Sequence, residues 1–507
     1  MVSGFDVGAA IVEDFSIEGL YGYRTVSMRA SHSAVILIAK NGSGKTTLLG
    51  ALDAFLNCQF GRLANIEFEV VKCRLKGFDG ELVLTSKNLE DLLRIPDSSE
   101  FLAMVRRTDV DASELLDFLI GDYSPHMSFS SLEEGDVARK IWARYGYRAD
   151  ECLKALAVVA ESIKGEVPEV DHVRDVVRKC LDGIEVVYLP TYRRIELALS
   201  ESVEEARAGR RRASVQSRLG ISKKSLFNTE IQFGLRDISD RLSQLNNQML
   251  FDSNQGYREI SAKIINDLLD GTFDRGFLSI IDRPSKESLE LFFSRLQEGT
   301  RFIGSFGRVD IPNFEKIYAE GAGTDASNKF LNYFLGKLNS VILATRSIEG
   351  LVEDFVGKCN GYLGGAEGED GDGSYHLGRS IDDKTLEIDR LTLQVHVVSR
   401  VSGRQVPMDS LSSGEKQMVS LFAKLYLYEG KKIVLIDEPE LSLSIDWQRK
   451  ILLDVVEAPT CAQLVAITHS PFVFDNDLEP YARPLMLKIS REGSSREDSY
   501  AREVFNG

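Results

Sequence analysis

The chain has 507 residues, of which 43% are hydrophobic and 27% charged, and this balance is typical of a soluble globular protein with enough apolar material for a large core. The net charge of −16 and the pI of about 5.1 argue against nucleic acid as a tight, general partner of the whole surface. No apolar run reaches the roughly 18 residues that cross a bilayer. The first ten residues contain no basic residue, whereas a secretory signal begins with positive charge, so we expect a cytoplasmic protein without membrane contact.

The N-terminal part of the chain has the pattern of short strands. Alternating apolar residues, and one run that is apolar throughout, predict strands at 10–15, 23–28 and 34–38. The last of these has the composition of a strand covered on both faces, and a glycine-containing loop and a helix over 46–56 follow it. We assign 1–86 to the N-terminal lobe of an α/β domain.

The loop after the strand at 34–38 has the features of a P-loop, since it lies between a buried strand and a helix. Its glycines would let backbone N–H groups surround a triphosphate. Lys45 would contact the β- and γ-phosphates and take part in catalysis, and Thr46 would offer its hydroxyl to Mg²⁺. The P-loop pattern usually begins with glycine, and Ala39 can take the place of this glycine if its φ is negative. The alternative to a P-loop is a glycine turn that occurs by chance. The expected ATP-binding residues are Asn41, Gly42, Ser43, Gly44, Lys45, Thr46 and Thr47.

A long section with mainly helical spacing follows. From 87 to 183 the pattern is helical with turns at prolines, and a strand closed by Pro190 is predicted at 184–189. We assign 87–199 to a helical insertion that returns to a core strand. We assign 200–350 to a helical arm or dimerisation subdomain.

Apolar residues in the section 200–350 recur at spacings of three and four in two runs. The runs predict two helices that form either an antiparallel arm or dimer contact, or a helical subdomain packed on its own core. Basic residues gather between Arg207 and Lys224, where a contact to nucleic acid and a solvated loop are the two interpretations. The apolar positions are Ile231, Leu235, Ile238, Leu242, Leu245 and Met249, then Ile260, Ile264 and Leu268.

Acidic residues and glycines are dense between 360 and 374, which predicts a surface loop rather than a calcium-binding loop. Alternating strands and helices after it predict a sheet with parallel strands. We assign 351–507 to the C-terminal lobe of the α/β domain. Its expected elements are strands at 386–389, 391–398, 433–436 and 464–467, and helices from Gly414 and from Ile445.

A second candidate anion site lies at Leu411-Ser412-Ser413-Gly414-Glu415. Serine, glycine and the start of a helix together favour anion binding, and we expect Ser412, Gly414 and Glu415 to contact nucleotide. On its own, the segment is equally compatible with a helix N-cap formed by Ser412 or Ser413.

The strand at 433–436 leads into Asp437 and Glu438. An apolar strand that ends in two acids is the Walker B arrangement, in which Asp437 would hold Mg²⁺ and Glu438 would act as general base on the attacking water. The strand at 464–467 leads into Thr468 and His469, and we expect this imidazole to lie near the γ-phosphate as a catalytic group. The alternatives are a capped turn for the two acids and a structural role for a lone histidine.

These four motifs, in this order, resemble those of ABC-type ATPases, where they are the P-loop, signature, Walker B and switch histidine. The long separation between Gly44 and Ser412 resembles the soluble branch of that family, with its SMC-type, RecF-type and OLD-type members. Ser444 and Ile445 stand where the OLD group often has His-Pro. Three segments of the sequence are similar to segments of OLD-like ATPases: 17–23, 189–196 and 437–443.

The resemblance implies a fold and a function. The fold is an ABC-type ATPase head, of the α/β class, split by a long, mainly helical insertion. Two copies would pair head to tail around ATP and Mg²⁺, with the signature of one copy facing the nucleotide of the other. Because 38 residues follow His469, we expect no TOPRIM nuclease domain of the OLD kind.

Within this branch, the chain looks like stand-alone antiphage-defence ATPases, such as PtuA of Septu and retron systems or the PARIS ATPase. That resemblance implies a homo-oligomer that controls a separately encoded effector, expected to be a nuclease. The rival interpretations are a DNA-repair or chromosome ATPase of the RecF or SMC type, and an ATP-dependent scaffold with little turnover.

Overall fold

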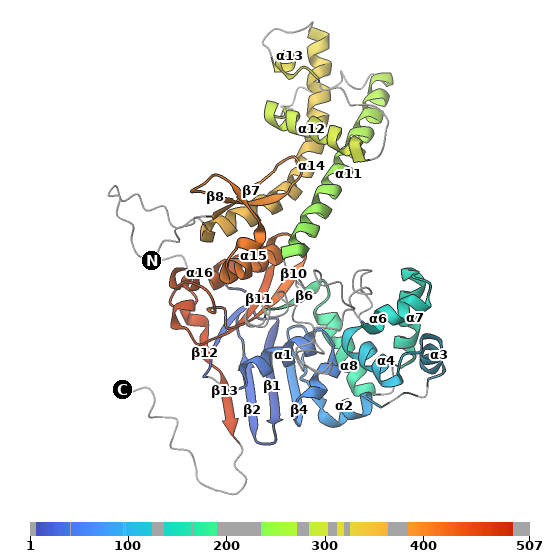
Figure 1. The fold of residues 1–507 in the computed structure, drawn as a ribbon, viewed down its shortest axis with the longest axis vertical. Helices are drawn as coiled ribbons and strands as arrows, with labels where there is room; N and C mark the ends of the chain where they lie inside the picture. The colour runs from blue at the N-terminus through green and yellow to red at the C-terminus, as the bar shows by residue number, and fades with distance from the viewer. Residues whose placement is uncertain are drawn as a thin grey trace, which may run out of the picture. The chain divides into compact units, whose positions relative to one another are not determined.

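The computed structural model of the chain describes residues 7–40, 42–94, 96, 98–123, 136–163, 167–189, 235–270, 283–302, 312–318, 325–363 and 384–489. The chain forms two compact units (Figure 1). The first contains Met1–Gln232 and Gly430–Gly507, and the second contains Phe233–Glu429. The first unit therefore combines segments from both ends of the sequence.

The first unit contains a five-stranded sheet in which all neighbouring strands are parallel, in the order β12-β3-β11-β10-β6. The register places Val434 of β10 beside Leu464 of β11 and Val187 of β6. β10 and β11 are almost entirely buried, as expected of strands covered on both faces. The strands are β3 (Ala34–Ile38), β6 (Ile184–Leu189), β10 (Lys431–Asp437), β11 (Cys461–Thr468) and β12 (Ala482–Pro484). The predicted parallel sheet is confirmed.

A second, antiparallel sheet has the order β13-β2-β1-β4-β5. The helix α1 (Lys45–Leu56) contacts strands of both sheets and is buried along most of its length, because its small and apolar residues face both of them. The loop that precedes α1 is thereby fixed at the edge of the parallel sheet. The strands are β1 (Val12–Leu20), β2 (Arg24–Arg29), β4 (Val70–Leu75), β5 (Leu82–Thr85) and β13 (Met486–Ile489).

The section after β5 is helical, as predicted, and has a core of its own around Phe101, Trp142 and Leu156. Polar caps begin several of its helices: Asp111, for example, accepts hydrogen bonds from the backbone N–H groups of Ser113 and Glu114. The helices are α2 (Ser86–Leu92), α3 (Ser99–Thr108), α4 (Ala112–Asp117), α6 (Asp136–Arg144), α7 (Ala149–Ser162) and α8 (Pro168–Cys180). The first unit also contains the helix α16 (Ile445–Val456) and the short 3₁₀ segments η1 (Phe60–Asn65), η5 (Pro471–Val473) and η6 (Glu479–Tyr481).

The second unit is built on long helices and a small antiparallel sheet with the order β7-β8-β9. The helix α11 packs along α14, and α15 packs on both. The helices are α11 (Leu235–Leu269), α12 (Lys286–Phe302), α13 (Phe314–Tyr318), α14 (Asp325–Leu363) and α15 (Ser413–Tyr426). The strands are β7 (Lys384–Ile388), β8 (Val395–Ser399) and β9 (Gln405–Val406), and the 3₁₀ segment η4 (Met408–Ser410) precedes α15.

The two apolar runs of the section 200–350 belong to one continuous helix, α11, and the prediction of two helices was wrong. Gly256, between the runs, is not a turn: a Cβ there would lie 2.7 Å from a side-chain carbon of Val341 in α14, so glycine permits close packing of the two helices. Most of the seam is buried within its own unit, since Ile238, Leu245 and Met249 are at most 1% exposed, whereas Leu268 near the end of α11 is 41% exposed. The buried positions therefore form a helical core. Ile231 lies outside the described residues.

Two loop predictions also differ from the structure. The acidic segment was expected from 360, but α14 continues to Leu363, and 364–374 lies outside the described residues. The strand expected at 391–398 begins only at Val395, because the Asp389 carboxylate accepts hydrogen bonds from the backbone N–H of Leu391 and the hydroxyl of Thr392. These bonds stabilise a turn there instead.

The predicted fold class is confirmed: an α/β head whose sheet strands come from both ends of the chain, separated by a long, mainly helical insertion. Among the described residues, none of the helices combines the length and the apolar composition needed to span a membrane.

Candidate nucleotide-binding site

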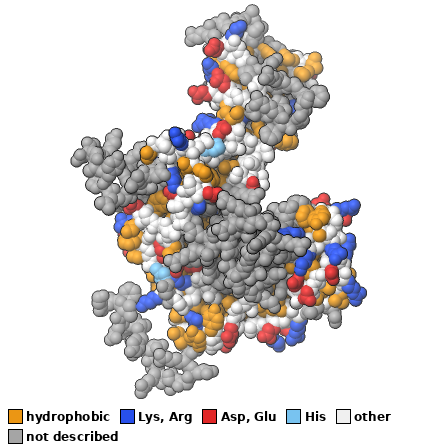
Figure 2. Space-filling model, in the orientation of Figure 1, with side chains coloured by type: hydrophobic (Ala, Val, Ile, Leu, Met, Phe, Trp, Pro, Cys, Tyr) orange, Lys and Arg blue, Asp and Glu red, His pale blue; other side chains and the backbone are white. Residues whose placement is uncertain are grey.

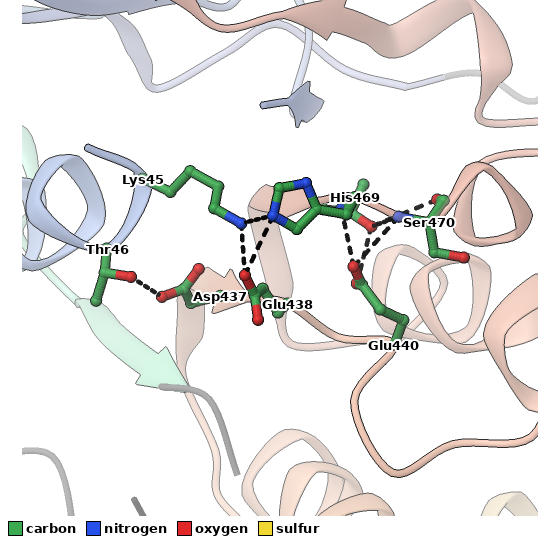
Figure 3. A network of polar contacts seen from close by, with 8 residues as sticks. Lys45, Thr46, Asp437, Glu438, Glu440, His469 and Ser470 are labelled. Atoms are coloured by element: carbon green, nitrogen blue, oxygen red, sulfur yellow. Dashed lines mark hydrogen bonds and ion pairs between the residues drawn. The ribbon is translucent and has the colours of Figure 1, made fainter. Parts of the chain in front are cut away.

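Three of the sequence motifs meet at one edge of the parallel sheet (Figure 3). The P-loop follows β3, Asp437 ends β10 with Glu438 directly after it, and His469 follows β11. Because β3, β11 and β10 are neighbours and run in the same direction, their carboxyl ends lie side by side. The topology thus brings together residues that are 391 to 424 positions apart in the sequence.

The P-loop backbone depends on its glycines. Gly42 and Gly44 have φ values of +78° and +90°, in the left-handed region that favours glycine. Gly44 is also the N-cap of α1, and no side chain caps that helix. Ala39 is not among the residues with positive φ, and its N–H donates to the Thr468 carbonyl at 3.4 Å, so alanine is compatible with the loop. Asn41 lies outside the described residues.

The functional side chains contact one another directly. The Thr46 hydroxyl donates to Asp437 Oδ2 at 2.7 Å, and the Lys45 ammonium donates to Glu438 Oε1 at 2.5 Å. Lys45 Nζ also contacts His469 Nε2, which lies 3.5 Å from Glu438 Oε1. The side chain of Lys45 is only 6% exposed, whereas those of Glu438 and His469 are 21% and 33% exposed. The cluster is therefore reached by solvent on the side of the glutamate and the histidine.

The backbone at Glu438 is strained. Its φ is +53°, a left-handed value that costs a non-glycine residue about 1–3 kcal/mol. The surrounding structure holds it there, because its N–H donates to the Ile467 carbonyl of the neighbouring strand at 2.8 Å. This conformation turns the carboxylate toward Lys45. Strain of this kind is found preferentially at functional positions, and the local sequence contains no signal for it.

The groups at this edge fit a phosphate and a hard cation. The buried Ser43 hydroxyl has no hydrogen-bond partner among the described residues, and the uncapped start of α1 presents backbone N–H groups, including that of half-buried Thr47. Lys45 adds a positive charge. The hydroxyl of Thr46 and the carboxylate of Asp437 are oxygen donors of the kind that Mg²⁺ prefers.

The turn between β1 and β2 is attached to the P-loop by Arg24, which the sequence reasoning did not identify. Its guanidinium donates to the Gly42 carbonyl at 3.0 Å and lies 5.0 and 5.1 Å from the ring centroids of Tyr21 and Tyr23. Both tyrosines are exposed. They offer aromatic faces beside the phosphate loop, and aromatic faces can stack on any nucleobase.

The signature segment lies in the second unit, at the start of α15. Ser412 is the N-cap: its hydroxyl accepts from the Glu415 N–H at 3.4 Å, and the Glu415 carboxylate accepts from the Ser412 N–H at 2.6 Å. Lys384 of β7 holds the same carboxylate at 3.1 Å. The serine–glutamate spacing of three was the sequence signal for this capping box. Ser412 is exposed and Gly414 is buried, so the serine and the helix start face solvent within this unit.

Sequence reasoning missed the residues that support His469. Glu440 accepts hydrogen bonds from the backbone of His469 and Ser470 (Figure 3), and Gln448 accepts one from the Ser470 hydroxyl. The contacts to His469 and Ser470 join residues 22 to 30 positions apart, and no local pattern predicts such pairs. The basic residues between Arg207 and Lys224 lie outside the described residues, and that prediction stays a prediction.

This strand–loop–helix arrangement, with a lysine, a threonine and two acids at the ends of parallel strands, is that of a P-loop ATPase domain. In agreement, residues 346–475 match a family described as "AAA domain, putative AbiEii toxin, Type IV TA system". The match covers about a quarter of the chain.

A solved structure, the Smc head domain with an extended coiled coil bound to the C-terminal domain of ScpA from Pyrococcus furiosus, is 12% identical to this chain. The alignment covers 94% of this chain and 96% of that chain at a TM-score of 0.31.

Proposed function

We propose that this protein binds ATP with Mg²⁺ at the edge formed by β3, β10 and β11, and hydrolyses it to ADP and phosphate. The observation that carries the proposal is the direct contact of Lys45 with Glu438 and His469, beside the contact of Thr46 with Asp437. These are the groups that phosphoryl transfer to water needs: a cation, a cation-binding pair and a base.

Each residue has a defined part in this proposal. The P-loop N–H groups and Lys45 bind the phosphates. Thr46 and Asp437 would hold Mg²⁺, which neutralises phosphate charge when bound. Glu438 orients the attacking water and accepts its proton, and the strained backbone aims its carboxylate. His469, on the solvent-exposed side, donates a hydrogen bond to the γ-phosphate.

We infer further that a second copy of the chain completes the site. The start of α15 offers an exposed serine and a helix N-terminus, which together favour an anion. In a head-to-tail pair, Ser412 and Gly414 of one copy would contact the γ-phosphate bound by the other. The protein would then be at least a dimer, and ATP would stabilise that dimer.

The biological role that we propose is control of a separately encoded effector, expected to be a nuclease, in a bacterial defence system. The family matched over 346–475 is described as an AAA domain and putative toxin of a type IV toxin–antitoxin system, which supports a place in a system that includes a toxic component. ATP would act through the shape of the assembly. A DNA-repair or chromosome ATPase would instead show strong stimulation of turnover by DNA, and purified chain with and without duplex DNA distinguishes the two.

The hydrolysis proposal is tested by Glu438→Gln. Turnover should fall by about 10²- to 10⁴-fold, because the glutamine cannot accept the proton of the water. ATP should still bind, and the closed dimer should accumulate. Glu479→Gln, the same change at an exposed acid of the same unit, should leave turnover unchanged. Full turnover in Glu438→Gln would remove this residue from its proposed role.

The shared site is tested by mixing two inactive variants. Lys45→Ala should not bind ATP, and Gly414→Asp should place a negative charge at the signature. A mixed dimer has one site with both intact halves, so the mixture should regain turnover that neither variant shows alone. A mixture as inactive as its components would contradict a site shared between copies.

The effector proposal is tested with the purified protein. The chain alone should not cut DNA or RNA with Mg²⁺ and ATP, and it should co-purify with the product of an adjacent gene. Nuclease activity of this chain that is abolished by a substitution outside the ATP motifs would contradict the proposal.

A further inference from the structure

The carboxylate of Glu440 binds three consecutive residues around His469 (Figure 3). Its Oε2 accepts from the Thr468 hydroxyl at 2.8 Å. Its Oε1 accepts from the backbone N–H of His469 at 2.8 Å and from that of Ser470 at 3.2 Å. Two backbone donors and a hydroxyl on one carboxylate fix the path of the chain where it leaves β11.

Gln448 of α16 makes a second connection between the same segments. Its amide oxygen accepts from the Ser470 hydroxyl at 2.7 Å. Its amide nitrogen donates to the carbonyls of Glu440 and Leu443, at 3.3 and 3.0 Å. The loop after Glu438 and the residues around His469 are thus joined by two side chains, that of Glu440 in the loop itself and that of Gln448 in α16.

The position of this network determines what it can do. Glu440 contacts the backbone of His469, not its ring, and the ring nitrogen Nε2 faces Lys45 and Glu438. The direction of the ring depends on the backbone to which it is attached. A side chain that fixes this backbone therefore fixes the imidazole relative to the phosphate-binding lysine.

We propose that Glu440 is a positioning residue for His469. It holds the residues 468–470 so that the imidazole faces the phosphate site, and it acts through hydrogen-bond acceptance and reach, not through its charge. This inference rests on the proposed function, because it assumes that His469 contributes to ATP turnover.

The first test compares three substitutions at one position. Glu440→Ala removes all three acceptor contacts, and kcat should fall by about 10- to 100-fold, as misplaced catalytic groups commonly cause. Glu440→Gln keeps one oxygen for both backbone N–H groups, and the Thr468 hydroxyl can turn to accept from its amide, so most activity should remain. Glu440→Asp keeps the charge but is one methylene shorter, and it should lose as much as alanine.

The order of these variants separates positioning from other roles. A carboxylate that acted by its charge, for example on a cation, would be replaced better by aspartate than by glutamine. The dissociation constant for ATP should change by less than about threefold in all three, because the P-loop contacts are unchanged. Glu457→Ala, at an exposed acid of the same unit, is the control and should match the unaltered protein. Aspartate more active than glutamine overturns the proposal.

The second test is a double-mutant cycle with His469→Ala. If Glu440 acts through His469, Glu440→Gln and Glu440→Ala should cause no further loss of kcat once the imidazole is absent. An equal loss in both backgrounds, with His469→Ala itself impaired, overturns this inference and leaves the proposed function in place. Full activity of His469→Ala contradicts the proposed role of the histidine and overturns the inference with it.

Discussion

Replacement of Gln463 should destabilise the first unit strongly. This side chain lies on β11, is fully buried, and joins the parallel sheet to the antiparallel one. Its oxygen accepts from the backbone N–H groups of Ile11 and Val12 at 2.9 and 2.7 Å, and its nitrogen donates to the Val12 carbonyl at 3.0 Å. Gln463→Met keeps the length of the side chain and removes all three bonds.

The expected cost follows from these contacts. Each bond contributes about 1 kcal/mol net, and a backbone group left buried without a partner costs about 1–3 kcal/mol. Since the relaxed variant would recover part of this, we expect the free energy of unfolding to fall by about 3–5 kcal/mol. For a unit of this size, that corresponds to a fall in Tm of roughly 5–8 °C.

Tryptophan fluorescence in urea measures this unit specifically, because both tryptophans, Trp142 and Trp447, belong to it. The midpoint should fall while the m-value stays unchanged. Lys72→Met, which breaks a half-buried ion pair with Glu18, is the matched control and should cost at most about 1 kcal/mol. A loss below about 1 kcal/mol in Gln463→Met would refute the reasoning.

Two further predictions concern buried ionisable groups. Asp53→Ala leaves the guanidinium of Arg62, which lies 2.7 Å from the carboxylate in a buried pair, without its counter-charge, and urea unfolding should show a loss of about 3–5 kcal/mol; a loss under about 1 kcal/mol would contradict this. Burial raises the pKa of the Cys58 thiol to about 11 and that of Cys461 to about 12, so both should react slowly with iodoacetamide at pH 8 in the folded protein and quickly in urea. Rapid labelling of the folded protein at pH 8 would contradict the raised pKa values. Because the unfolded chain loses these protons first, near pH 9.0, the free energy of unfolding should fall as pH rises from 9.0 through the pKa values of the folded protein.

The sequence predicted the parallel sheet and the place of the motifs because both depend on local patterns. A continuous apolar run followed by glycines, or by two acids, identifies a buried strand and the loop at its carboxyl end without knowledge of neighbours. Adjacent parallel strands then bring such loops together, which is why Lys45, Glu438 and His469 are found in contact.

Other features depend on contacts between distant segments, and the sequence could not predict them. The sequence has no signal for the close packing at Gly256, which becomes visible only when α14 places Val341 beside it. Glu440 lies in an acidic segment of the sequence, which contains no neighbouring partner for its side chain. Its function as an acceptor becomes visible only when β11 places Thr468 and the following N–H groups beside it.

The central claim, that ATP is held at this P-loop, is tested most directly by equilibrium binding of a fluorescent ATP analogue in the presence of Mg²⁺. Lys45→Ala removes charge-assisted bonds to two phosphates, each worth about 1.5–3 kcal/mol, so affinity should fall by about 100-fold or more. Lys40→Ala, at an exposed lysine of the same loop, should bind as the unaltered protein does. Unchanged affinity in Lys45→Ala, or equal losses in both variants, would contradict the account.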